Sequence, residues 1–133
     1  MLYQLLDIFF LIFHLALIVF VLTGWIWRKT RPWNLAAILL VLASWFLLGL
    51  KYGMGYCPLT DWHWRVLHQL GQYQLPSSYV SYLILRVTGW LPNQNTIDVL
   101  TLLATLTAFI LSAYLSIRDH MQYRKRKQEI SKR

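Results

Sequence analysis

Three long apolar runs constrain the fold of this chain more than any other feature of its sequence. They cover residues 9–27, 33–50 and 97–117, and His14 and Asp98 are the only histidine or charged side chains within them. A helix needs about 20 predominantly apolar residues to cross the hydrocarbon core of a bilayer. We therefore expect an all-α integral membrane protein with three transmembrane helices.

The composition agrees with a membrane protein. Charged residues make up 14% of the chain and hydrophobic residues 57%, whereas a soluble domain carries about 25% charged residues. Neither Lys nor Arg precedes the first apolar run, and no small-residue cleavage site follows it. We interpret this run as a retained helix rather than a signal peptide.

The basic residues predict the orientation. Ten of the 13 lie in residues 28–32 and in the tail 118–133, and the other three are Lys51, Arg65 and Arg86. The positive-inside rule then places the N-terminus and residues 52–95 outside, with residues 118–133 as a basic cytoplasmic tail after a single membrane domain, 1–117. Basic residues clustered directly after an apolar run stop translocation, so their position argues against nucleic acid as a partner. Anionic lipid headgroups are a possible partner of the tail.

The outer segment, residues 52–95, is expected to hold one or two short interfacial helices. Thr60 is a suitable N-cap for a helix over residues 61–70, and Gly71 suits its end. Residues 77–91 are apolar enough to suggest a fourth span, but the run is short and contains Arg86. A fourth span would also put the basic loop and the basic tail on opposite faces, so we favour a helix lying in the interface.

Before this outer helix lies a turn that we treat as a candidate motif. Its residues are Cys57, Pro58, Leu59, Thr60, Asp61 and Arg65. Asp61 and Arg65 are four residues apart and can form an ion pair on an exposed helix face. Cys57 is the only cysteine, so the chain has no intramolecular disulfide.

Polar residues within the spans are few, and their spacing places them on shared helix faces. His14, Ser44, Thr101 and Thr105 are expected to lie at one depth, in the outer half of the membrane, as an intramembrane polar cluster. Asp7, Lys51 and Asp98 are expected at the outer boundary just above it. Small and hydroxyl side chains at this spacing are typical of helix–helix contacts.

His14 has two interpretations. A neutral imidazole bonded to Ser44 or Thr105 would be a structural pin, whereas an ionisable residue inside a membrane is also a candidate for function. The functional roles are proton handling, ligation of haem or a metal, and a hydrogen bond to a quinone or a lipid headgroup. The candidate cofactor ligands are His14, His63 and His68. His63 and His68 point about 140° apart on a helix, and no metal-binding motif is present.

Three stretches carry a resemblance to a known family. The stretch from His14 to Gly24, followed by Gly55-Tyr-Cys-Pro-Leu-Thr60, resembles a family of small bacterial membrane proteins described only as a domain of unknown function. The tract from Pro76 to Leu83 is similar to its later aromatic segment, and the resemblance covers residues 1–117. It implies a multi-pass protein of the bacterial inner membrane, with His14 and Cys57 to Thr60 as the positions of interest.

The chain departs from that family in one place. Relatives often carry a glutamate shortly after the turn, where this chain has Trp62-His63-Trp64. Any role that needs a carboxylate there would fall to Asp61.

For function, the sequence favours a non-catalytic accessory or scaffold component, with the bilayer and a membrane protein or a second copy as partners. One alternative is a redox protein that binds haem, a metal or a quinone through His14. A second is a lipid-modifying enzyme or a transporter of lipids or other amphiphiles. No catalytic constellation stands out, so we lean against an enzyme.

Overall fold

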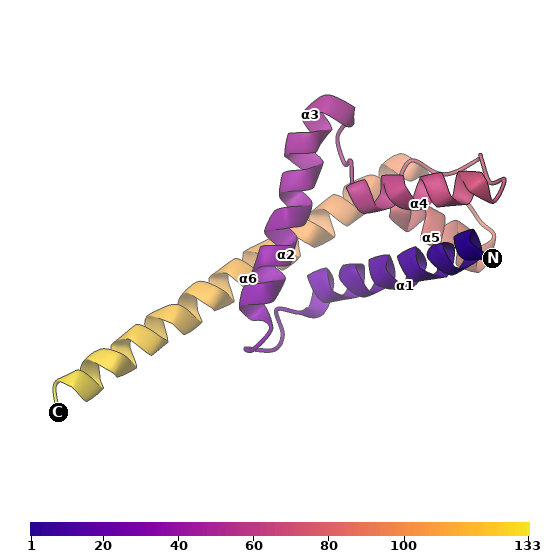
Figure 1. Ribbon diagram of the computed structural model, residues 1–133. Coiled ribbons are helices and arrows are strands. Elements are labelled where there is room, and N and C mark those ends of the chain that lie inside the picture. Colours follow the sequence, from indigo (N-terminus) through magenta and orange to yellow (C-terminus); the bar gives the residue numbers. More distant parts are fainter.

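The computed structural model describes all 133 residues and contains only helices. They are α1 (Leu2–Thr23), α2 (Arg31–Ala43), the π-helix η1 (Ser44–Leu48), α3 (Gly49–Tyr52), α4 (Pro58–Gln69), α5 (Tyr79–Thr88) and α6 (Gln94–Ser131). In Figure 1, α1 and α6 begin at the same end of the molecule, beside α4 and α5. The segments α2, η1 and α3 form one column that rises away from α1.

Three helices are long and apolar enough to cross a membrane: Leu2–Thr23, Arg31–Tyr52 and Gln94–Ser131. This confirms the all-α membrane fold with three spans. The first helix is shifted toward the N-terminus relative to the predicted run of residues 9–27. The second span, Arg31–Tyr52, is one continuous helix that includes a π-helical turn starting at Ser44.

The α1–α2 connection is held by one buried amide. Asn34 is fully buried, and its Nδ2 donates to the carbonyl oxygens of Phe20, at 2.6 Å, and Val21, at 3.2 Å. These carbonyls belong to the last turn of α1, where backbone donors run out, and the Phe20 oxygen also accepts from the Gly24 N–H at 2.8 Å. Gly24 follows directly, and a Cβ there would lie 2.7 Å from the Phe20 oxygen and 2.8 Å from Asn34 Nδ2. Only glycine fits this close approach.

An ion pair joins the same connection to α6. Arg31 Nη1 lies 2.6 Å from Asp119 Oδ2, and Arg28 lies 3.4 Å from the other carboxylate oxygen. Arg31 also donates from Nε to the Trp25 carbonyl oxygen. The basic loop of residues 28–32 and the start of the basic tail therefore lie at the same end of the molecule.

The outer segment forms two helices, but the predicted helix start at Asp61 was wrong. Helix α4 begins at Pro58 with Cys57 as N-cap residue, so Thr60 lies inside the first turn. Proline suits the first position of a helix because its missing N–H would have no partner there. Gly71 has a φ of 81°, which fits its predicted place after the helix end. Helix α5 has 10 residues, or about 15 Å at 1.5 Å per residue, which is too short for a fourth span.

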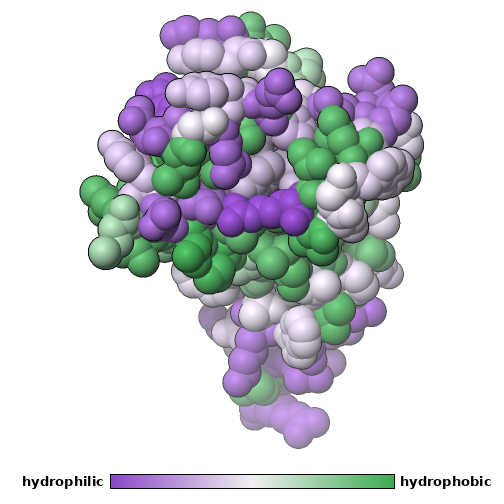
Figure 2. All heavy atoms as spheres, turned by 90° about the vertical axis from the view of Figure 1, so that its right-hand side faces the viewer, coloured by the Kyte–Doolittle hydropathy of each residue, from purple (hydrophilic) through white to green (hydrophobic).

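Helix α6 continues far beyond the third predicted span. It has 38 residues, or about 57 Å, against a hydrocarbon core of about 30 Å. The basic segment after residue 117 is thus helical as far as Ser131. The end of this helix, at the bottom of Figure 2, is mostly hydrophilic, whereas the nearer end of the molecule mixes hydrophilic and apolar residues.

Candidate functional site

A buried carboxylate organises the end of the molecule at which α1 begins. Asp7, in the second turn of α1, is 8% exposed. Its two oxygens accept hydrogen bonds from both terminal nitrogens of Arg86 in α5, at 2.7 and 3.0 Å. Such two-pronged pairing is the strongest geometry available to an arginine and a carboxylate. It fixes α5 against α1 across 79 residues of sequence.

His63 of α4 is the second partner of Asp7. Its side chain is fully buried, and Nε2 lies 2.8 Å from Asp7 Oδ1. On the other side of the ring, Nδ1 lies 3.0 Å from the hydroxyl oxygen of Tyr79. Asp7 is held as a carboxylate by Arg86 and can only accept, so His63 donates from Nε2. The neutral ring then accepts at Nδ1, and the Tyr79 hydroxyl is the donor.

The hydrogen bonds thus form a continuous chain that we call the polar relay: Arg86, Asp7, His63 and Tyr79. Burial lowers the pKa of His63 below its usual value of about 6.5, although the hydrogen bond to Asp7 opposes this. Hydrogen bonding to Asp7 raises the pKa of Arg86 above its usual range. Burial also raises the pKa of the Tyr79 hydroxyl. At neutral pH the relay therefore holds a charged pair, a neutral imidazole and a neutral phenol.

His14 lies beside the Tyr79 end of the relay. Its ring stacks on that of Tyr79 with centroids 3.7 Å apart and planes 7° apart. The side chain is 7% exposed, and Nδ1 is buried without a hydrogen-bond partner in the protein. A buried polar atom without a partner is uncommon and needs an explanation.

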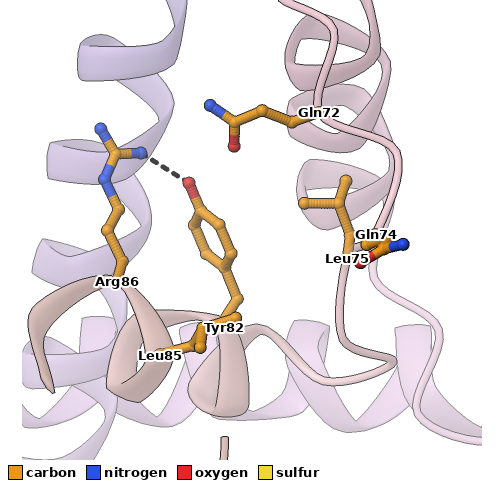
Figure 3. Close-up of a pocket in the computed structure, with 6 residues that line it drawn as sticks. All are labelled: Gln72, Gln74, Leu75, Tyr82, Leu85 and Arg86. Atoms are coloured by element: carbon orange, nitrogen blue, oxygen red, sulfur yellow. Dashed lines mark hydrogen bonds between the residues drawn. The ribbon is translucent and has the colours of Figure 1, made fainter. Parts of the chain in front are cut away.

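At the Arg86 end the relay borders a small polar hollow of about 250 Å³. Tyr82, Leu85 and Arg86 of α5 form one wall, and Gln72, Gln74 and Leu75 of the α4–α5 loop form the other (Figure 3). Arg86 donates to the Tyr82 hydroxyl at the centre of this view. The arginine side chain is 34% exposed, so this end of the relay is in reach of water.

At the Tyr79 end lies a larger cavity of about 540 Å³, with 15 hydrophobic residues among the 23 that line it. We call it the bundle cavity. Helices α1, α6, the start of α5 and the π-helical turn form its walls, and Met54, Gly55 and Cys57 of the α3–α4 connection contribute as well. His14 and Tyr79 both line it. Its volume falls within the usual range for small-molecule sites, about 300–1,000 Å³.

The structure brings three of the four predicted intramembrane polar residues to this cavity. His14, Thr101 and Thr105 line it. Ser44 does not: it begins the π-helical turn and donates to the Tyr56 carbonyl oxygen at 2.9 Å, which ties the α3–α4 connection to the column. His14 is therefore not bonded to Ser44, and Thr105 donates instead to the Thr101 carbonyl oxygen.

The three predicted outer-boundary charges do not meet. Asp7 belongs to the relay, Lys51 lies over the ring of Tyr52, and Asp98 is an exposed residue of the bundle-cavity lining. In the outer turn, Cys57 and Thr60 line the same cavity. Asp61 and Arg65 form the expected pair at 3.1 Å, with the arginine side chain 75% exposed.

The candidate cofactor ligands are separated. His63 is buried with both ring nitrogens engaged, whereas His68 is exposed and stacks on Tyr73. No group of three or more His, Cys, Asp or Glu side chains is placed to hold a metal ion. Of the three predicted ligands, only His14 both lines the bundle cavity and has a ring nitrogen without a hydrogen-bond partner in the protein.

The relay was not predicted from the sequence. Arg86 entered the prediction through the charge count and as a reason against a fourth span, Asp7 was expected at the outer boundary, and Tyr79 was covered only by the aromatic tract from Pro76 to Leu83. The missed signal was the pair of opposite charges in apolar surroundings, Asp7 and Arg86, because a charge buried among apolar residues needs a partner.

A comparison with protein families assigns the chain to a family. A family model described as a protein of unknown function (DUF2784) matches residues 4–117. The chain belongs to this family. The match confirms the resemblance to a family of unknown function, and it includes every residue of the relay and the cavity but not the tail. No curated protein and no solved structure matches the chain.

Proposed function

We propose that this protein is a non-catalytic membrane component that binds an amphiphilic molecule in the bundle cavity. The carrying observation is that buried His14, with an unpartnered nitrogen, lines an apolar cavity of about 540 Å³. Ligand sites are typically apolar with a few placed polar groups. An alkyl or isoprenoid chain would lie along Leu17, Ile18 and Val21, with its polar head beside His14 and Tyr79.

The relay supports binding rather than catalysis. Its order of carboxylate, imidazole and hydroxyl has the connectivity of the acid–base–nucleophile set of serine hydrolases. A nucleophile, however, needs activation, and burial raises the pKa of Tyr79 instead. We therefore assign the relay a positioning role, in which it holds α4 and α5 over α1 and orients Tyr79 at the cavity wall.

For the setting, we propose the bacterial inner membrane with the N-terminus outside. Support comes from the ten basic residues of the 28–32 loop and the tail, which the ion pair of Arg31 and Asp119 brings to the same end. The relay and the polar hollow would then face the outside.

The test is to purify the protein in a mild detergent and identify the bound small molecules by mass spectrometry. Ala104 lines the cavity, so Ala104→Phe is the blocking variant. Ala36→Phe, at an exposed position on α2, is the matched control. We expect wild type and Ala36→Phe to retain an alkyl-chain molecule that Ala104→Phe lacks. Identical small-molecule content in all three proteins would refute the proposal.

The same preparations test the redox alternative. An absorption spectrum and a metal analysis of wild type beside His14→Ala would detect haem, a metal or a quinone. A chromophore present in wild type and lost in His14→Ala would make this protein a cofactor carrier.

A further inference from the structure

The lining of the bundle cavity contains no positively charged side chain. Neither Lys nor Arg lines it, and its one formally charged residue is Asp98, which is exposed. Arg86, the nearest cation of the relay, is paired with Asp7 on the other side of Tyr79. A carboxylate or phosphate head in this cavity would lose its hydration without gaining a counter-charge, which is costly.

Several hydroxyl groups of the lining already use their proton in a hydrogen bond within the protein. Thr101 and Thr105 donate their hydroxyl protons to the carbonyl oxygens of Ile97 and Thr101, each at 2.8 Å. Ser77 donates its hydroxyl proton to Gln94 Oε1. Each of these three oxygens is therefore left with lone pairs and no free proton.

The hydrogen bonds of the relay likewise engage the hydroxyl proton of Tyr79. Because Asp7 can only accept, His63 donates to it and accepts from Tyr79, so the phenolic proton is committed to Nδ1. The Tyr79 oxygen also keeps only lone pairs. Among the remaining polar groups of the lining, neutral His14 has one donor and one acceptor, and Ser78 and Thr60 each keep a free hydroxyl proton. Trp45 adds an indole N–H donor and Cys57 a weakly donating thiol. Acceptors thus outnumber donors along the wall.

From this asymmetry, and resting on the proposed amphiphile site, we infer the class of its ligand. The bundle cavity takes an amphiphile whose head group donates hydrogen bonds, a hydroxyl or an amine, and it rejects carboxylate and phosphate heads. His14 and Tyr79 accept from the head, and Asp98 at the exposed edge adds attraction for a cationic amine. Discrimination of this kind arises because a buried acceptor left unpaired costs about as much as the hydrogen bond it loses.

The test uses four probes with one alkyl chain: dodecanol, dodecylamine, laurate and dodecyl phosphate. The full-length protein is reconstituted in zwitterionic nanodiscs, and apparent dissociation constants are taken from the ligand-dependent shift of the thermal unfolding midpoint. Ala104→Phe serves as the blocked control for partitioning into the bilayer. We expect cavity-dependent binding of the alcohol or the amine at least about tenfold tighter than that of laurate and dodecyl phosphate, the factor of one hydrogen bond.

A second variant distinguishes binding of the amine head group from binding of the hydroxyl head group. Asp98→Asn should weaken binding of dodecylamine and leave binding of dodecanol unchanged. If laurate or dodecyl phosphate binds wild type as tightly as dodecanol and dodecylamine, and Ala104→Phe abolishes that binding, the inferred ligand class is overturned while the amphiphile site stands. If none of the four probes shifts wild type more than Ala104→Phe, the amphiphile site itself is refuted.

Discussion

The pairing of Asp7 with Arg86 makes a quantitative prediction for a double-mutant cycle. Asp7→Leu and Arg86→Met each remove one partner, and the double variant removes both. Removing one member of a fully buried ion pair costs about 3–5 kcal/mol. The Arg86 side chain is 34% exposed, so water compensates part of the loss. We therefore expect a coupling free energy of about 2 kcal/mol, the size of one charge-assisted hydrogen bond.

The unpaired Nε2–H of His63 does not disturb this value. Asp7→Leu and the double variant both leave that group without its acceptor, so its cost cancels from the coupling term. The assay is reversible unfolding in mixed detergent and SDS micelles, followed by circular dichroism. All four proteins are measured at neutral pH and the same ionic strength.

A second cycle in the same molecule serves as the control. Asp61 and Arg65 are four residues apart on α4, with the arginine side chain 75% exposed. For such an exposed helical pair we expect a coupling of only about 0.3–0.5 kcal/mol. If Asp7 and Arg86 couple no more strongly than Asp61 and Arg65, the relay does not hold α5 on α1 and our account of the contacts among α1, α4 and α5 is wrong.

Three further predictions test other parts of the molecule. Gly24→Ala should lower the free energy of unfolding by about 1–3 kcal/mol, the usual cost of overpacking, in the same SDS assay; an unchanged value would contradict the close approach there. Because burial lowers the folded-state pKa of His63, the unfolded state binds more protons as pH falls below about 6.5. Wild type should therefore lose stability from pH 7 to pH 5 by at most about 1.4 kcal/mol per pH unit from this group, and His63→Gln should lose less; equal losses would show that His63 does not titrate in this way. In a Cys57→Ser background, a membrane-impermeant maleimide should label Gln74→Cys in intact cells and Ser131→Cys only after lysis, and the reverse pattern would invert the proposed orientation.

The sequence was sufficient for the spans because their signal is local. Each apolar run is longer than a soluble core helix and carries almost no charge, and that alone predicts a membrane helix. Boundaries were less accurate because caps and tertiary contacts decide them. Asn34 and Gly24 end α1 at the close approach of two segments, and Pro58 starts α4 earlier than Thr60 would. Neither effect follows from hydropathy.

The candidate site was only partly accessible from sequence. His14, Thr101 and Thr105 were placed together because helical spacing and depth are readable from the chain. The relay was missed because Asp7, His63 and Arg86 come from three helices, and their contacts depend on how α4 and α5 fold back. The short helices of residues 52–95 were expected to lie in the membrane interface, whereas the structure packs α4 along α1. That single difference converts a surface carboxylate into a buried one.

The relay also explains why the outer segment folds back at all. Hydrocarbon tails solvate an apolar helix as well as another apolar helix does, so apolar contact alone gives little reason to dock in a membrane. Asp7, His63 and Arg86 supply a reason, because each would be costly to leave unpaired in apolar surroundings and each finds its partner on a different helix. The docking places Tyr79 beside His14 and so builds one wall of the bundle cavity. On this argument the charged end of the relay sets the position of the outer helices, and its uncharged end presents the polar atoms that a ligand would meet.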